Sequence, residues 1–241
     1  MAFDSWRGTV GIIKPTLRPG SIEDLIRILP DGIGVVVTHI DIRTGTRDEF
    51  AQVIPHYEAR VAELAEADVE IIHPAGAPPF FLLGYQGERE LLARWEAKYK
   101  KPVFTNGTTQ INALRAFGAK SFVGVSYFPG EINKTYAKYF IEAGFDVREM
   151  EGMNVAFDQV QTLSSREVYK FLRKLFLKHT DVDAIYMLGS GWRTLDIIEM
   201  MENDFGIPVV HHIPAQSWEI QKRLHVRQKL TGYGRLLAEM P

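Results

Sequence analysis

Short apolar runs alternate with longer amphipathic stretches along the chain. Runs rich in valine, isoleucine and aromatic residues predict strands at 9–14, 33–40, 69–76, 102–106, 122–128, 184–190 and 207–213. In the longest stretch between them, 48–67, apolar residues recur three and four positions apart, as on one face of a helix. Pro55 interrupts that stretch and predicts a kink or the end of a first turn. The alternation is typical of parallel βαβ units, so we expect an α/β fold.

Small polar residues predict where several helices begin. Ser21 precedes "IEDLIRIL", Ser164 or Ser165 precedes "REVYKFLRKLFLKH", and Thr194 precedes "LDIIEMMENDFG". Their hydroxyls can accept hydrogen bonds from the free N–H groups of a first helical turn, so we expect N-caps at these positions. Helix ends are expected at Gly118, Gly144 and Gly206.

Composition indicates an ordinary globular protein with small-molecule partners. The 241 residues are 46% hydrophobic, which is enough for a sizeable core in one large or two small domains. A net charge of -2 gives no electrostatic reason to expect nucleic acid or an anionic membrane as partner. No apolar run approaches the ~20 residues that span a bilayer, and "MAFDSWRGTV" lacks the order of a signal peptide. We therefore expect a cytoplasmic protein.

The chain contains no cysteine. A disulfide, a thiolate metal site and a cysteine nucleophile are therefore all excluded.

The ends of the predicted strands suggest what the protein binds. In a doubly wound sheet the ligand lies at the carboxyl ends of the strands. Hydroxyl-bearing, small and histidine residues dominate there, and acidic residues are almost absent, which argues against a magnesium or calcium site. Neither a Walker loop nor G-x-G-x-x-G is present. Such an edge suits a small anion, for example a carboxylate held by hydroxyls and helix N-terminal amides.

Four segments together resemble a known family. They are "GAPPFFLLG", "PVFTNGTTQINALRAFGAKSFVGVSYF", "LGSGWRTLDII" and "GYGRL", in this order along the chain. The chain is similar in these segments to the maleate isomerase and arylmalonate decarboxylase branch of the aspartate/glutamate racemase superfamily. The resemblance implies two pseudo-symmetric flavodoxin-like halves with parallel sheets and an active site in the cleft between them. The first half would comprise residues 1–104 plus 213–241, and the second 105–212.

The resemblance also implies a chemistry. Members of this family transfer protons, isomerise or decarboxylate beside a carboxylate, without metal or organic cofactor, and usually depend on cysteine from one or both halves. The two cysteine positions match Gly76 and Gly189 here. Two-base racemisation through thiols is thereby excluded, and isomerisation by thiolate attack is disfavoured. Hydroxyl residues that usually follow the first position are replaced by Ala77 and Pro78.

Other side chains must therefore act as acid, base or nucleophile. His73, three residues before Gly76, and His211, at the end of the last predicted strand, are candidate general bases, with packed histidines as the alternative. Strand alternation turns His211 and His212 to opposite faces, so at most one should face the cleft. No third ligand stands at a zinc-site spacing from them, so no metal is expected. Ser190 is a candidate nucleophile, or else a turn or cap residue.

Further residues are candidates for binding the substrate. Tyr127 matches a tyrosine that, in the resembling family, donates a hydrogen bond to the substrate carboxylate, with a structural role as the alternative. Thr108 and Thr109 begin a predicted helix and could form a carboxylate cradle or only cap it. Asn154 resembles a substrate-binding asparagine of maleate isomerases. Lys14 could pair with a second carboxylate or extend into solvent. The remaining candidates are Pro15, Gly76, Ala77, Gly189 and Gly191.

Three functions remain open. We favour a cofactor-independent decarboxylase or isomerase that acts on a small carboxylic or dicarboxylic acid through an enediolate-like intermediate with a non-cysteine acid or base. The alternatives are a hydrolase or hydratase that uses Ser190 or a histidine-activated water, and a noncatalytic carboxylate-binding protein. The expected partner is a small carboxylate, and a homo-oligomer is possible.

Overall fold

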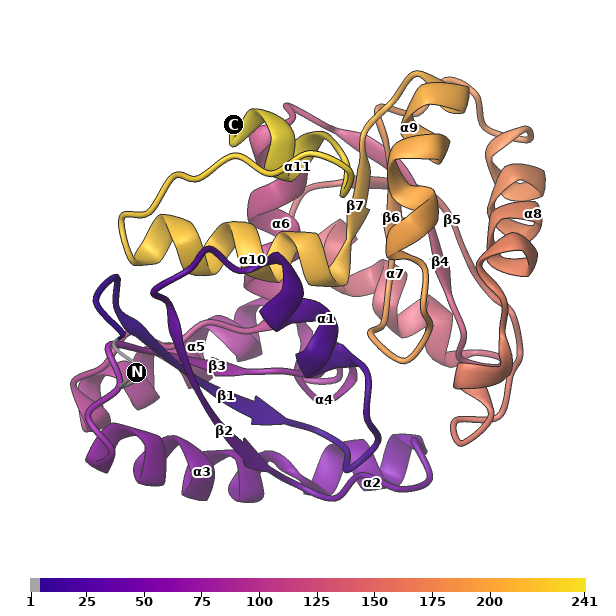
Figure 1. Cartoon of the computed structure of the whole chain (residues 1–241). Coiled ribbons are helices and arrows are strands. Elements are labelled where there is room, and N and C mark those ends of the chain that lie inside the picture. The colour runs from indigo at the N-terminus through magenta and orange to yellow at the C-terminus, as the bar shows by residue number, and fades with distance from the viewer. Residues whose placement is uncertain (1–4) are drawn as a thin grey trace.

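The computed structural model describes residues 5–241 and consists of two parallel β-sheets, each flanked by helices (Figure 1). The first sheet has the strand order β2-β1-β3 and the second β5-β4-β6-β7. The strands are β1 (Thr9–Lys14), β2 (Gly34–His39), β3 (Ile71–Pro74), β4 (Ser121–Ser126), β5 (Asp146–Gly152), β6 (Ala184–Met187) and β7 (Val209–His211). All strand pairs are parallel, so the predicted α/β fold is confirmed.

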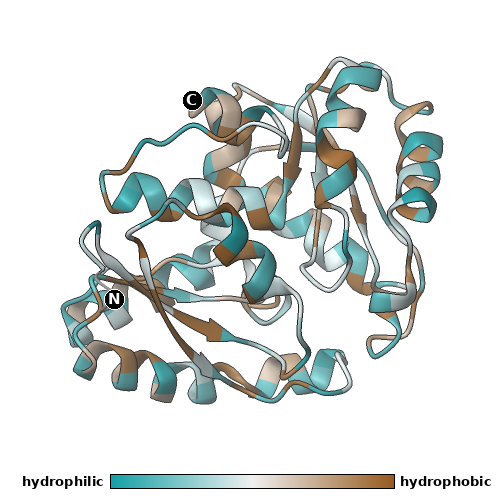
Figure 2. Ribbon diagram, viewed as in Figure 1, coloured by the Kyte–Doolittle hydropathy of each residue, from teal (hydrophilic) through white to brown (hydrophobic). Residues whose placement is uncertain are grey.

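Helices connect the strands and cover both sheets. They are α1 (Ser21–Ile28), α2 (Arg47–Gln52), α3 (Ile54–Glu66), α4 (Ala77–Phe81), α5 (Gly84–Tyr99), α6 (Asn106–Ala116), α7 (Ile132–Glu142), α8 (Ser165–Phe176), α9 (Ile198–Phe205), α10 (His212–Arg223) and α11 (Arg235–Glu239). Figure 2 shows predominantly hydrophobic strands and helices of mixed polarity, as expected for sheets buried between amphipathic helices. No helix among residues 5–241 is long and apolar enough to cross a membrane.

The two halves repeat the same order of elements. Residues 102–104 bridge Ile72 in parallel beside β3, in the position that β7 occupies beside β6. Each of these segments leads directly into a helix, α6 in the first case and α10 in the second. α6 and α10 pack against each other at the centre of the molecule, and α10 also packs on α1 (Figure 1). Because α6 also contacts α4 and β7, the division 1–104 plus 213–241 against 105–212 remains a prediction.

Several boundaries differ from the sequence-based expectation. The stretch 48–67 forms two helices, α2 and α3, with Pro55 in the first turn of α3. Proline interrupts the interior of a helix but is tolerated in its first turn, and the position of Pro55 agrees with this preference. β5 was not predicted, because it is an edge strand whose sequence, "DVREMEG", alternates charged and apolar residues with little burial.

The helix starts were predicted with mixed success. Ser164 caps α8 as expected, and Glu167 completes a capping box with it. The prediction of Ser21 as an N-cap was wrong, because Ser21 is the first residue of α1 and Gly20 is the N-cap. The N–H of Gly20 donates to the carboxylate of Glu23 at 2.7 Å. Residues 1–4 of the N-terminal stretch considered above lie outside the described residues.

Candidate active site

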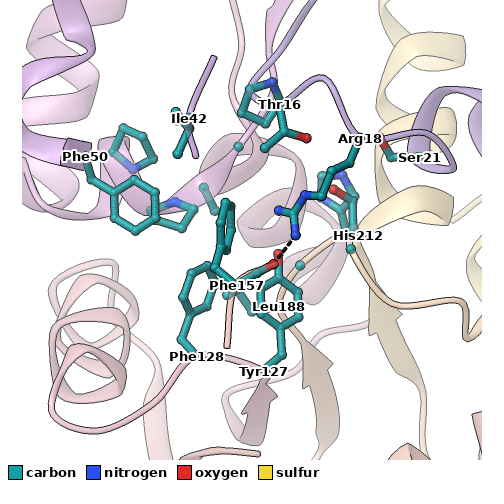
Figure 3. A pocket seen from close by; sticks show the side chains of 18 of the residues that line it. Thr16, Arg18, Ser21, Ile42, Phe50, Tyr127, Phe128, Phe157, Leu188 and His212 are labelled. Atoms are coloured by element: carbon teal, nitrogen blue, oxygen red, sulfur yellow. Dashed lines mark hydrogen bonds between the residues drawn. The ribbon is translucent and has the colours of Figure 1, made fainter. Parts of the chain in front are cut away.

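A cavity lies between the carboxyl ends of the two sheets (Figure 3). Loops that follow β1, β3, β4 and β6 supply most of its lining, which agrees with the position of ligands in doubly wound sheets. Its lining residues are Pro15, Thr16, Arg18, Pro19, Ser21, Ile42, Phe50, Gly76, Ala77, Pro78, Pro79, Tyr127, Phe128, Phe157, Gln161, Leu188, Gly189, Ser190, Gly191 and His212. The cavity is thus built from both halves of the chain.

The cavity has an apolar side and a polar side. Figure 3 shows Ile42 and Phe50 on one side and Arg18 and His212 on the other, with Tyr127 below. Among residues 5–241, Arg18 is the only charged residue in the lining, and no acidic residue contributes to it. An anion with an apolar substituent therefore matches the cavity in both charge and polarity.

A buried hydrogen-bond network centred on Asn106, the first residue of α6, adjoins the cavity. The N–H of Gly76 donates to Asn106 Oδ1 at 2.6 Å, which fixes the orientation of the amide because a backbone N–H can only donate. Asn106 Nδ2 then lies 2.9 Å from His212 Nδ1 and 3.4 Å from His73 Nε2. The Asn106 amide therefore binds the Gly76 N–H through its oxygen and two imidazoles through its two N–H donors.

His212 is the histidine that faces the cavity. Its Nδ1 accepts the hydrogen bond from Asn106, so the proton of the neutral ring lies on Nε2. Nε2 has no hydrogen-bond partner among residues 5–241, and the ring lines the cavity. Burial lowers the pKa of His212 to about 4, so near neutral pH the ring is uncharged and offers a single N–H donor to a ligand.

His73 and His211 lie outside the cavity lining. Nδ1 of His73 donates to the carbonyl of Phe104 at 2.8 Å, and its Nε2 faces Asn106. His211 caps α10: its Nδ1 accepts from the N–H of Ile213 at 3.2 Å, and its Nε2 donates to Thr194 Oγ1 at 2.9 Å. Burial lowers the pKa of both imidazoles to about 3. Neither histidine has a nitrogen free for a substrate.

Tyr127 lies in the cavity wall and fills the space beside Gly189. The tyrosine is 5% exposed, and its ring packs edge-on against Trp192 at 5.4 Å between centroids. Burial raises the pKa of Tyr127 to about 12, against opposing effects from Arg18 and the Gly191 N–H, so the phenol is a neutral donor. A Cβ on Gly189 would stand 2.2 Å from the Tyr127 ring, and the φ of Gly189 is +112°. The space of a side chain at Gly189 is therefore occupied by Tyr127.

Gly76 is closed in the same way. Its φ is +99°, and a Cβ there would approach the Tyr57 hydroxyl to 2.8 Å and Pro15 to 3.1 Å. The Tyr57 hydroxyl is held in place because it donates to the carbonyl of Ala75 at 2.5 Å. Both positions that match the cysteines of the resembling family thus have a backbone conformation that favours glycine and no room for a side chain.

Lys14, Thr108, Thr109 and Asn154 do not line the cavity. The ammonium of Lys14 is buried against the carbonyls of Thr16 and Arg18. Thr109 donates to the Asn106 carbonyl at 2.9 Å, and Thr108 lies in the first turn of α6, where Thr105 is the N-cap. Asn154 is an exposed loop residue with φ +56°, and its Oδ1 accepts from the N–H of Gly130.

Ser190 lines the cavity without an activating base. Within the described chain, its hydroxyl has no hydrogen bond to a histidine or a carboxylate. The same residues contain no group of three or more histidine, aspartate or glutamate side chains that could hold a metal ion. The cavity therefore offers hydrogen-bond donors and one cation, and no obvious nucleophile.

A cavity between two pseudo-symmetric α/β halves, lined by hydrogen-bond donors, is typical of ligand sites in doubly wound α/β proteins. Comparison with known sequences is more specific. The family description "Arylmalonate decarboxylase" matches residues 10–237, and the chain belongs to this family.

Individual relatives are distant but cover nearly the whole chain. An arylmalonate decarboxylase from Bordetella bronchiseptica is 22% identical over 233 residues, which are 96% of this chain and 97% of the relative. A maleate isomerase from Nocardia farcinica is 24% identical over 212 residues, 84% of this chain and 82% of the relative. The crystal structure of the maleate isomerase Iso from Pseudomonas putida S16 superposes with a TM-score of 0.86 at 19% identity, and the match covers 97% and 99% of the two chains.

Several residues of this site were not predicted from the sequence, and three of them matter for its chemistry. Arg18 lies in a loop, four residues beyond the end of β1. It was not predicted because only residues directly after each strand were considered as candidates. Asn106 is fully buried at the start of α6, and only the structure shows that its amide joins both halves. His212 was recognised only as one of an adjacent pair; the signal that separates it from His211 is the helix start between them.

We expect acid to destabilise the fold through the three buried histidines. In the unfolded chain each imidazole binds a proton near pH 6.5, whereas in the folded protein it does so only near pH 3 to 4. Between these values the unfolded state binds more protons, so lowering the pH lowers the free energy of unfolding, by up to about 1.4 kcal/mol per pH unit per histidine. Glu88, whose pKa burial raises to about 7, opposes this trend.

The measurement is urea denaturation between pH 6.5 and 5.0. His211→Gln should flatten the average slope by about 1 kcal/mol per pH unit, because it removes one such histidine. His56→Gln, at an exposed position, is the control, because it removes a histidine that is not buried. Equal slopes for all three proteins would contradict the assignment of His211 as buried and neutral.

Gly189→Ala should destabilise the protein by more than its backbone strain alone. The control is Gly144→Ala, at φ +94° with open space around the added Cβ, which reports the cost of the backbone conformation alone. We expect Gly189→Ala to cost about 1 to 3 kcal/mol beyond that control, the usual range for overpacking. Thermal or urea denaturation measures both variants. Tyr127→Ala in the Gly189→Ala background should remove most of the difference, and purely additive costs would show that the two residues do not compete for space.

Proposed function

We propose that the protein is a cofactor-independent decarboxylase or isomerase of a small carboxylic or dicarboxylic acid, with decarboxylation favoured. Membership of the arylmalonate decarboxylase family and similarity to a decarboxylase and an isomerase support this activity. The two-sided cavity is the observation that carries it. Decarboxylation needs an apolar site where a carboxylate can lose its charge and a polar site where negative charge can accumulate, and the cavity provides both.

The steps follow from this division. The carboxylate on the apolar side leaves as CO₂ when its bond to the α-carbon breaks, and the electron pair of that bond delocalises into the retained carboxylate as an enediolate. Tyr127 donates a hydrogen bond to this enediolate, and its raised pKa keeps its proton in place. A proton then moves from Nε2 of His212 to the α-carbon, and the ring regains a proton from water.

A neutral imidazole can serve here because of its surroundings. Asn106 donates to Nδ1, so negative charge that forms on the ring while Nε2 gives up its proton is partly compensated. This arrangement replaces the thiol that the resembling family uses. Isomerisation by covalent attack has less support, because the chain has no cysteine and Ser190 lacks a base.

The direct test is to incubate the protein with phenylmalonate or with maleate and follow the products by proton NMR. We expect loss of CO₂ from phenylmalonate, unaffected by a chelator. His212→Gln should lower the rate about 10²- to 10⁴-fold, the usual contribution of a general acid, whereas His56→Gln at an exposed position should not change it. If folded His212→Gln converts phenylmalonate as fast as the wild type, His212 does not take part in the proton transfer.

Ser190→Ala separates this mechanism from the hydrolase alternative. We expect less than a tenfold loss of rate, because the serine contributes at most a hydrogen bond. A nucleophilic serine would cost several powers of ten when removed. Loss of all turnover in a folded Ser190→Ala protein, with oxygen-18 from water in the product, would favour a hydrolase instead.

A further inference from the structure

Arg18 is a cation without an anionic partner. It lies in the loop between β1 and α1 and, of the residues that the structure describes, is the only charged one that lines the cavity. No carboxylate lies within ion-pair distance of its guanidinium in the part of the chain that the structure describes. One of its five N–H donors is used by a protein acceptor, the carbonyl of Phe157. The remaining donors are available to a ligand.

The loop that carries Arg18 is held in place by a second buried cation. Lys14 is 5% exposed, and its ammonium donates to the carbonyl of Thr16 at 2.8 Å and to the carbonyl of Arg18 itself. A buried ammonium is costly unless its donors are satisfied, so these bonds favour one conformation of the loop. The positive charge of Lys14 also lies close behind the cavity and adds to its attraction for anions.

Contacts from the second half of the chain complete this side of the cavity. The guanidinium of Arg18 stacks over the Phe157 ring, 4.0 Å from its centroid. Gln161 donates to the carbonyl of Pro19 at 2.6 Å, so the loop 15–20 is joined to the segment around 157–161 at two points. Arg18 is thereby oriented toward the polar side of the cavity, where Figure 3 shows it above Tyr127.

We propose that Arg18 binds the carboxylate that the substrate retains, and so selects for acids whose reacting carbon carries a second anionic group. This inference rests on the proposed decarboxylation. A carboxylate becomes neutral as it leaves as CO₂, so a cation beside it would oppose the reaction. The same cation beside the retained carboxylate stabilises it increasingly as it becomes an enediolate and gains charge.

This role also accounts for the altered sequence after Gly76. Ala77 and Pro78 stand where the resembling family usually has hydroxyl residues, and neither offers a side-chain donor. Pro78 and Pro79 also lack an N–H, so α4 presents few backbone donors to the cavity. Arg18 supplies a planar pair of donors from the facing loop, which suits bidentate binding of a carboxylate.

The test compares two ligands of the same shape and different charge. Phenylacetate and phenylacetamide differ in charge at the carboxyl position, and isothermal titration calorimetry measures their affinities. In Arg18→Gln we expect the affinity for phenylacetate to fall about 10- to 100-fold, the scale of a charged hydrogen bond, while the affinity for phenylacetamide stays within about twofold. Arg18→Lys keeps the charge but loses the paired guanidinium donors, so its affinity for phenylacetate should lie between those of the wild type and Arg18→Gln. Arg27→Gln, an exposed position on α1, is the matched control.

The outcomes separate this inference from the proposed function. If wild type binds and decarboxylates phenylmalonate and Arg18→Gln does so equally well, the role of Arg18 is wrong and the function stands. If wild type binds inorganic phosphate in an Arg18-dependent way but neither binds nor converts any of the carboxylates, the site is an anion receptor and the proposed carboxylate is wrong. If wild type binds none of these anions, both proposals fall.

Discussion

The hydrogen bond between Asn106 and His212 is the interaction on which the candidate site depends. These residues are the first of α6 and α10, the two helices that follow equivalent strand positions in the two sheets, so one bond links the two helix starts. The oxygen of the same amide accepts from the Gly76 N–H, and the second N–H of its nitrogen faces Nε2 of His73. Loss of this one amide would release a glycine turn, leave buried polar atoms unpaired and free the tautomer of His212.

Charge is distributed in the site by a consistent rule. The buried imidazoles remain neutral because burial lowers their pKa values, and the buried Tyr127 remains neutral because burial raises its pKa. Within the described part of the chain, only Arg18 brings a full charge to the cavity wall. A ligand therefore meets one cation among oriented neutral donors, and an incoming anion does not compete with any carboxylate of the lining.

Sequence reasoning located the cavity better than it assigned the chemistry. Pro15, Gly76, Tyr127 and the turn 189–191 all line the cavity, because parallel strands of one sheet end at one edge. The cavity-facing histidine was harder to predict. It depends on where β7 ends and α10 begins, and that boundary falls between the two adjacent histidines His211 and His212. Lys14 illustrates another limit: its position at a strand end was suggestive, but its charge is used inside its own loop, which no spacing rule reveals.

The occupied spaces beside Gly76 and Gly189 limit how this protein can change. A thiol introduced at either position would meet a tyrosine and an unfavourable backbone at once, so a single substitution leads through a less stable intermediate. At Gly189 the obstacle is Tyr127 itself, the residue proposed to stabilise the enediolate, so making room for sulfur would remove a hydrogen-bond donor of the proposed reaction. The cysteine-free site is therefore separated from a site with a thiol at either position by coupled changes, and an engineer who wishes to introduce the thiol has to redesign the neighbouring tyrosine first.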